Sequence, residues 1–125
     1  MKSLYVVLTV SISSACYSQS NFIGIGFQKD IKESWNLSLK EIDNKSFQVR
    51  YPSIPCTAIW KVVKQTNDYV VYKEKLTSGY DRCIDNGYIF IVNDTFSNST
   101  KRFYIFEKAG DDNPYAYGFL EKIEN

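Results

Sequence analysis

The sequence contains no histidine, and this absence excludes several kinds of functional site. Serine and cysteine nucleophiles need an adjacent base, most often histidine, so Ser-His and Cys-His arrangements cannot form. Zinc sites that use imidazole are excluded too, and the chain has only three cysteines to offer in their place. We therefore expect no metal site, no cofactor and no catalytic residues, and we predict that the protein is not an enzyme.

An excess of charge of either sign is also lacking. Lysine and arginine together number 15, aspartate and glutamate 14, and the formal net charge is +1. The longest basic cluster is only Lys101-Arg102. Nucleic-acid binding depends on basic side chains that neutralise many phosphates. The near-neutral composition therefore predicts that nucleic acid is not a partner.

Long hydrophobic runs are missing except at the amino end. Leu4 to Ile12 is almost uninterrupted, follows Met1-Lys2, and leads into small and polar residues as far as Gln19. This run is too short to cross a bilayer, which takes roughly 20 residues, but it fits the apolar core of a signal peptide. Residues 1–18 are thus predicted to be a signal peptide, and residues 19–125 a single exported domain, periplasmic or secreted.

A second form of export stays open because Ser13-Ser14-Ala15-Cys16 resembles the lipobox of a bacterial lipoprotein. A signal that ends at Ala15 would leave Cys16 as an acylated first residue and anchor the domain to the outer membrane. That lipid is the only membrane contact that we expect. Cleavage after Ser18 would instead release a soluble domain.

Cys56 and Cys83 remain once the signal has taken Cys16. Two cysteines in a small exported chain most often form a disulfide. The bridge would close a loop in the middle of the chain and would stabilise the fold by about 3 kcal/mol in the loop-entropy model. The alternative is a pair of buried free thiols.

Alternating apolar and polar residues dominate the chain after Gln19 and indicate an all-β fold. Turn residues such as Asp43-Asn44-Lys45 and Asn86-Gly87 separate the alternating segments at fairly even spacing. Short strands in this rhythm predict a small antiparallel meander barrel of about eight strands, with a two-sheet β-sandwich as the alternative. The expected strands are Asn21–Gln28, Trp35–Ile42, Ser46–Tyr51, Thr57–Gln65, Tyr69–Leu76, Tyr88–Asn93, Arg102–Lys108 and Tyr115–Ile123.

Glu74 is the most informative charged residue. In its strand it shares a face with Tyr72 and Leu76, which indicates a buried carboxylate. A buried charge must be paired or protonated, since stranding it costs several kcal/mol. Arg82 is the expected partner, with Arg50 as a second choice. The pair would be a structural ion pair or a polar group at the floor of a cavity; the remaining alternative places Glu74 in solvent.

Aromatic residues are abundant and allow two interpretations. Tyrosines near strand ends could form a surface that binds protein or glycan; they are Tyr51, Tyr80, Tyr88, Tyr115 and Tyr117. Aromatic side chains also prefer the pleated faces of strands, where they would fill the barrel. The candidates to point inward are Trp35, Phe47, Tyr51, Trp60, Tyr72, Phe90, Phe103 and Phe119.

The segment from Tyr51 to Gly87 resembles a small exported bacterial domain with a Tyr-Pro-x-x-x-Cys run, a Glu-containing strand and Gly-x-x-x-Cys. The residues that carry this resemblance are Tyr51-Pro52, Cys56, Trp60, Glu74, Gly79 and Cys83. It implies an all-β fold, a Cys56–Cys83 bridge, and a structural or binding role for Glu74, but no activity. At the level of fold the chain is also similar to avidin- and lipocalin-type barrels, although it lacks their Gly-x-Trp opening.

Three functions are compatible with these features. The first is an exported binding module that recognises a protein or glycan at the cell envelope. The second is a lipocalin-like carrier of an apolar ligand, and the third is a structural envelope protein without a separable ligand. Because many aromatic side chains are expected inside so small a barrel, little cavity should remain. We therefore favour the binding module, as a monomer.

Overall fold

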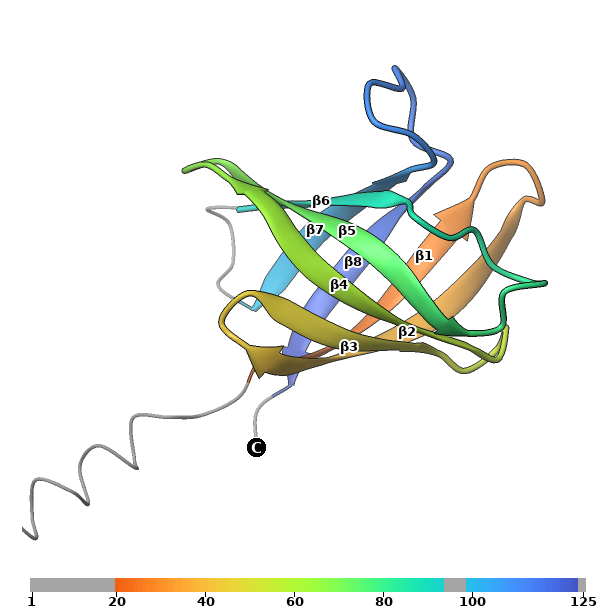
Figure 1. The fold of residues 1–125 in the computed structure, drawn as a ribbon, viewed down its shortest axis with the longest axis horizontal. Coiled ribbons are helices and arrows are strands. Elements are labelled where there is room, and N and C mark those ends of the chain that lie inside the picture. The colour runs from red at the N-terminus through yellow and green to blue at the C-terminus, as the bar shows by residue number, and fades with distance from the viewer. Residues whose placement is uncertain (1–19, 94–98, 124–125) are drawn as a thin grey trace, which may run out of the picture.

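A computed structural model describes residues 20–93 and 99–123 of the chain. The predicted signal peptide, with Cys16, lies outside the described residues. The described part forms eight antiparallel strands (Figure 1). They are β1 (Asn21–Gln28), β2 (Glu33–Asp43), β3 (Ser46–Tyr51), β4 (Cys56–Gln65), β5 (Tyr69–Ser78), β6 (Tyr88–Val92), β7 (Thr100–Phe106) and β8 (Ala116–Ile123).

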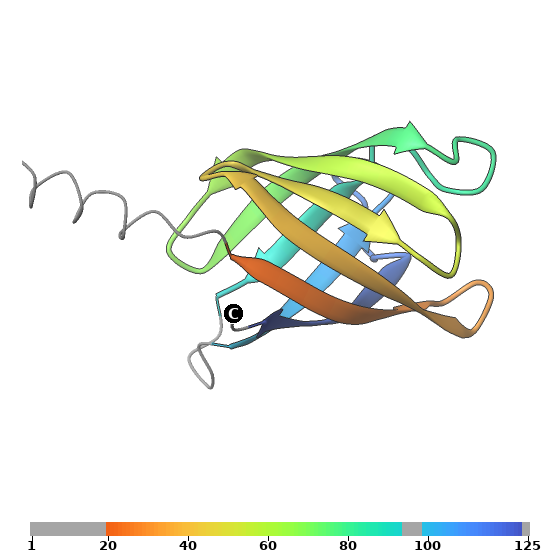
Figure 2. The same ribbon diagram turned by 90° about the horizontal axis from the view of Figure 1, so that it is seen from below.

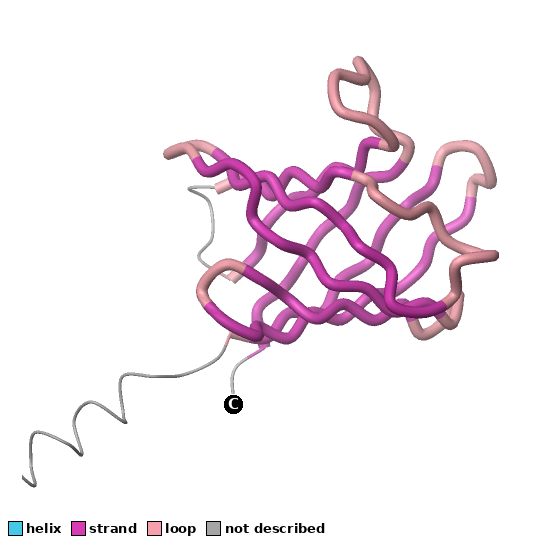
Figure 3. Tube along the Cα trace, viewed as in Figure 1, coloured by secondary structure: helices cyan, strands magenta, loops and turns pink. Residues whose placement is uncertain are grey.

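The strands follow one another around a closed barrel in chain order. Each strand pairs with the next, and β8 returns to pair antiparallel with β1 from Asn21 opposite Ile123 to Gln28 opposite Ala116. The meander barrel predicted from the alternation is thus confirmed, and the sandwich alternative is excluded. Figure 2 shows the barrel wall after a 90° turn, and Figure 3 shows strands joined only by loops, with no helix in the described residues.

The barrel interior is filled with apolar side chains that alternate along the strands. In β3, for example, Phe47, Val49 and Tyr51 are buried while Gln48 and Arg50 are exposed. The largest fully buried side chain is that of Trp60. The other buried aromatic and aliphatic residues of the core include Phe22, Trp35, Leu37, Leu39, Tyr72, Leu76, Ile89, Ile91, Phe103, Ile105 and Leu120.

Two aromatic residues that were expected inside lie on the outer side of the wall instead. Phe119 is 47% exposed and falls between buried Gly118 and Leu120. Phe90 is half-buried and falls between buried Ile89 and Ile91. Strict alternation decides both positions, because the smaller neighbours occupy the interior.

Glycines let β1 and β8 approach closely at the point where the barrel closes. Gly26 lies opposite Gly118. A Cβ atom at Gly118 would lie 2.0 Å from the carbonyl oxygen of Ile25, and one at Gly26 would lie 2.5 Å from the ring of Trp35. These glycines therefore allow a close backbone contact between the two strands, and Gly26 leaves room for an indole ring.

Candidate functional site

The connection between β5 and β6, residues 79–87, lies at one end of the barrel together with the β1–β2 and β3–β4 connections (Figures 1 and 2). The predicted disulfide is present and joins Cys83 of this connection to Cys56 at the start of β4. Gly79 begins the connection with a positive φ of 76°, and a Cβ there would lie 2.8 Å from the sulfur of Cys56. The 79–87 connection is therefore covalently held to the barrel wall.

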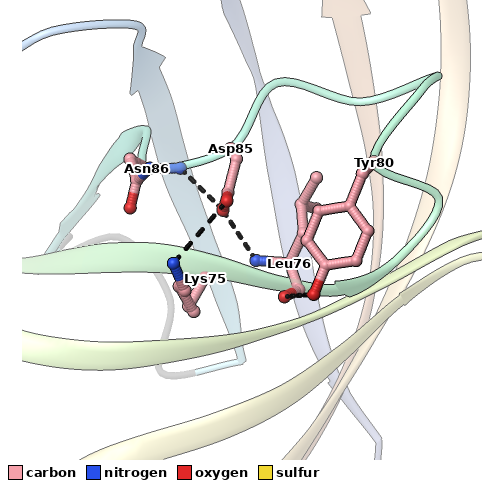
Figure 4. A network of polar contacts seen from close by, with 5 residues as sticks. All are labelled: Lys75, Leu76, Tyr80, Asp85 and Asn86. Carbon is pink, nitrogen blue, oxygen red and sulfur yellow. Dashed lines mark hydrogen bonds and ion pairs between the residues drawn. The ribbon is translucent and has the colours of Figure 1, made fainter.

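Hydrogen bonds fix the other half of this connection to β5 (Figure 4). Leu76 and Asn86 donate their backbone N–H groups to Oδ1 of Asp85 over 2.8 and 2.9 Å. The ammonium of Lys75 lies 3.8 Å from the same carboxylate. Tyr80 donates its hydroxyl to the carbonyl oxygen of Leu76 over 2.8 Å. These contacts replace the missing ladder partner of β5 beyond the point where its pairing with β6 ends.

A small cavity of about 60 Å³ lies inside this end of the barrel. Its walls come from strands β1, β2, β3, β5 and β7, from the 79–87 connection, and from the β3–β4 and β7–β8 connections. The lining residues are Gln28, Trp35, Tyr51, Ile54, Glu74, Arg82, Cys83, Ile84, Ile105 and Tyr115.

Glu74 lies in the wall of this cavity and is 3% exposed. Trp60 stands directly opposite on β4 and donates its indole N–H to Oε2 of Glu74 over 2.8 Å. The hydroxyl of Tyr51 donates to the same oxygen. Within the described residues no hydrogen bond reaches Oε1 and no cation forms an ion pair with this carboxylate. One oxygen of a buried acid in the cavity wall thus has no hydrogen-bond partner among the described residues.

Burial raises the pKa of the Glu74 carboxyl above its usual value. The hydrogen bonds from Tyr51 and Trp60 act in the opposite direction, and the charge of Asp85 adds to the increase. The pKa of Tyr51 is raised well above its usual value by burial and by the charge of Glu74. Tyr115 shows a raised pKa for the same two reasons. Both phenols therefore stay neutral and able to donate at physiological pH.

Trp35, which also lines the cavity, carries a second unusual polar group. The residue is 6% exposed, and its indole N–H has no hydrogen-bond partner. Its ring packs edge-on against Tyr51, with the ring centroids 5.5 Å apart. A buried indole N–H normally finds an acceptor, so the absence of one marks this cavity as unusual.

Arg82 is not the partner of Glu74, which corrects the expected ion pair. Its side chain lines the cavity but is 58% exposed, and its Nε atom lies 4.0 Å from a carboxylate oxygen of Asp81. Residue 82 belongs to the turn after Gly79, where the side chain reaches solvent at little cost. Two neutral donors on neighbouring strands, Tyr51 and Trp60, bind the carboxylate in its place.

The five tyrosines proposed as a binding surface are separated by the fold. Tyr51 is buried at 5% exposure, because the alternation of β3 points it inward; its assignment to the surface is wrong. Tyr115 is half-buried and lines the cavity. Tyr80 is exposed in the 79–87 connection. Tyr88 and Tyr117 lie on the outer side of β6 and β8.

A second, larger hollow lies on the outside of the barrel over β1 and β8, and we call it the outer groove. Its volume is about 490 Å³. Cross-strand pairs place Ile25 opposite Phe119 and Ile23 opposite Glu121. Asn36, Ser38, Thr100 and Glu121 add polar groups to a lining that is otherwise apolar. The complete lining is Ile23, Gly24, Ile25, Asn36, Leu37, Ser38, Pro52, Thr100, Phe119, Leu120 and Glu121.

Apolar side chains extend beyond this groove across the outside of the barrel. Phe27 lies opposite Tyr117, with ring centroids 5.8 Å apart. The same row continues to Tyr104 on β7 and to Phe90 on β6. By contrast, the outward residues of β3 are Gln48 and Arg50. The barrel wall is therefore polar on one side and aromatic on the other.

Sequence reasoning identified only part of this outer side: it named Tyr117 as a surface residue, but it placed Phe90 and Phe119 in the interior. Both faces of β1 are apolar or glycine, so alternation alone did not tell which side Ile23, Ile25 and Phe27 occupy. The sequence around Gly118 could have indicated this arrangement. Where Gly118 faces the interior, alternation along the strand places the rings of Tyr117 and Phe119 on the outer side. Trp35 and Trp60 were correctly expected in the core, but the alternation along their strands does not indicate what their indole N–H groups contact.

Comparison with family models, with curated proteins and with solved structures gave no match. The small all-β barrel agrees with the fold-level similarity to avidin- and lipocalin-type barrels, while the Tyr-Pro-x-x-x-Cys resemblance has no further support. Within residues 20–93 and 99–123, no helix is long and apolar enough to span a bilayer. The same residues contain no cluster of three or more metal-ligating side chains.

Proposed function

We propose that the domain is an exported binding module that recognises a partner protein through the outer groove. The observation that carries this proposal is the exposed apolar surface of β1 and β8. Ile23, Ile25, Phe27, Tyr117 and Phe119 are each between 38% and 51% exposed. Contiguous exposed apolar surface on a soluble domain commonly marks an interaction site.

The lining of the outer groove favours a protein over a glycan. Phe119 is the only aromatic residue among those that line it, and branched Ile23 and Ile25 beside this ring offer no flat platform on which a sugar ring could stack. An apolar side chain of a partner would instead fill the groove, while Asn36, Ser38 and Glu121 form hydrogen bonds at its rim. The barrel is closed, so a partner cannot add a strand to an open edge and must be read by side chains.

Two further features fit an exported binding protein. The Cys56–Cys83 disulfide is compatible with an oxidising compartment. The interior is packed with apolar side chains and leaves about 60 Å³ at one end. Pockets for drug-sized ligands take roughly 300–1,000 Å³. Transport of a large apolar ligand inside the barrel is therefore less well supported than recognition at its surface.

Affinity capture with matched variants tests the proposal. The mature domain is immobilised and exposed to envelope extract of the producing cell, alongside Phe119→Ser and Ile42→Ser variants. Ile42 is also exposed, at 43%, but does not line the outer groove. We expect one protein to be retained by the wild type and by Ile42→Ser and lost with Phe119→Ser. Retention by all three, or capture of glycan instead of protein, contradicts the proposal.

A further inference from the structure

We propose that the cavity beside Glu74 binds a primary ammonium group. This site is separate from the outer groove, and neither proposal depends on the other. It rests on the contacts of a buried acid, 3% exposed, that has lost most of its contact with water and forms no ion pair with a cation among the described residues.

The carboxylate of Glu74 has no cation partner among the described residues. A buried carboxylate is stable when a cation or several hydrogen bonds compensate it. Here both hydrogen bonds converge on Oε2, and Oε1 receives none from the described residues. An ammonium on the cavity side would supply the missing charge and the missing donor together.

The cavity also has an aromatic lining. Trp35, Tyr51 and Tyr115 contribute their rings to its walls. The π-faces of such rings attract a cation, most strongly where water is excluded. Aromatic walls around an acidic floor form the combination that recognises ammonium groups, whereas an apolar ligand would gain nothing from Glu74.

The buried indole N–H of Trp35, a residue of the cavity lining, has no hydrogen-bond partner. A buried donor without an acceptor indicates that the cavity receives a polar occupant rather than staying dry. An oxygen beside the ammonium, from the ligand or from a water that enters with it, would accept this hydrogen bond. The volume of about 60 Å³ admits a group of only a few non-hydrogen atoms.

The part of the cavity wall that the 79–87 connection forms is held in place. The Cys56–Cys83 bridge and the Asp85 hydrogen bonds hold the 79–87 connection against the cavity. A wall fixed in this way does not have to be ordered when the ligand enters, which lowers the cost of binding.

Tryptophan fluorescence gives a direct test, because the only two tryptophans of the chain, Trp35 and Trp60, both surround Glu74. The mature domain is titrated with methylammonium chloride, with Nα-acetyl-lysine amide, and with potassium chloride as the salt control. We expect a saturable change in emission with an amine and none with potassium chloride. Response to methylammonium alone indicates a free small amine, and response to the lysine derivative indicates a protein side chain.

Variants assign the response to its residue. Glu74→Gln should weaken amine binding roughly 10- to 100-fold, the loss typical of a charge-assisted hydrogen bond. Glu121→Gln, which removes a carboxylate from the outer groove, should leave it unchanged. Equal binding by Glu74→Gln, no response to either amine, or the same saturable response to ethylene glycol would overturn the proposal. The capture experiment on the outer groove is unaffected by any of these outcomes.

A second measurement keeps the test decisive if Glu74→Gln does not fold. Amine binding by the wild type should weaken as pH falls through the pKa of Glu74, because a proton then competes for Oε1. The other titratable or charged groups facing this carboxylate are Tyr51, Tyr115, Arg82 and Asp85. The two tyrosines have raised pKa values and stay neutral, and the lowered pKa of Asp85 places its titration below that of Glu74. Binding that does not change between pH 4 and 8 would contradict the proposal.

Discussion

At the scale of single residues, Glu74 combines an ionisable carboxyl group with a buried position. Its carboxyl group is buried beside two tryptophans and a tyrosine, and burial raises its pKa. The folded state therefore binds a proton at Glu74 more readily than the unfolded chain, in which a glutamate has a pKa of about 4.3. The stabilising contribution of this proton is complete at low pH and is lost as pH rises through the folded pKa.

Glu74→Gln should remove this dependence on pH. The free energy of unfolding of the wild type, relative to that of the variant, should fall between about pH 4 and neutrality, by about 1.4 kcal/mol for each unit of pKa shift. Denaturant unfolding of both proteins across this range measures the difference. Comparison with the variant cancels the opposite effect of Asp43 and Asp85, whose pKa values are lowered. A difference that grows in favour of the wild type with pH would refute a raised pKa.

Tyr51→Phe tests the hydrogen bond that Tyr51 donates to the buried acid. Loss of this donor leaves Trp60 as the only hydrogen-bond partner of Oε2 among the described residues, and should cost about 1–3 kcal/mol. Tyr80→Phe is the matched control, because its hydroxyl also donates one hydrogen bond but the residue is 62% exposed. Its loss should cost less than about 1 kcal/mol, since water replaces the donor. Equal costs in urea unfolding would show that burial does not set the value of the Tyr51 contact.

At the scale of elements, the 79–87 connection is held by one covalent bond and a few polar contacts. Its sequence predicted a turn with positive φ at Asn86-Gly87; Asn86 has a positive φ of 64°, but Gly87 does not, so this pair does not form a tight hairpin turn. The remainder of the connection could not be predicted, because Asp85 caps the edge of β5 through a contact with Leu76 that no local pattern reveals.

Removal of the disulfide should release this connection. The double variant Cys56→Ser, Cys83→Ser should lose about 2–5 kcal/mol of stability. For a domain of this size each kcal/mol lowers the melting temperature by roughly 4–8 °C. Thermal unfolding followed by circular dichroism, with and without reductant, measures the change. A wild type that melts at the same temperature after reduction would mean that the bridge does not stabilise the fold.

The β1–β8 contact closes the barrel and has its own test. Gly118→Ala places a Cβ 2.0 Å from the carbonyl oxygen of Ile25, so the two strands must separate. We expect a loss of about 3 kcal/mol, at the upper end for overpacking. Gly110→Ala is the control, because Gly110 has a positive φ of 87° but nothing within 4 Å. That change should cost only about 1 kcal/mol from backbone strain. Similar losses in urea unfolding would show that the close approach is not the constraint.

At the scale of the whole molecule, the fold was largely predictable and the sites were not. Alternation in segments such as Ser46–Tyr51 identified the strands, and even spacing identified the meander barrel, because both depend on local pattern. The contact of Glu74 with Trp60 depends on register between β4 and β5, which single strands do not reveal. The outer side of β1 was not predicted, because a sequence pattern assigns an apolar residue to the core even where the side chain faces outward.

The two sides of the barrel wall differ in polarity. Polar residues such as Gln48 and Arg50 are exposed on the β3 side. The β8 and β1 side, with Phe119 and Ile25 at its centre, is the surface that we propose binds a partner protein. The cavity beside Glu74 opens at the end of the barrel near the 79–87 connection, so the two proposed sites can act independently.

Site-specific photocrosslinking tests the central proposal most directly. A benzophenone amino acid replaces Phe119 in one protein and Gln48, which is exposed on β3, in another. Irradiation in the producing cell should give one discrete adduct with a different envelope protein from position 119 and none from position 48. Adducts from both positions, an adduct only with a second copy of the chain, or no adduct from position 119 would contradict recognition of a partner protein through the outer groove.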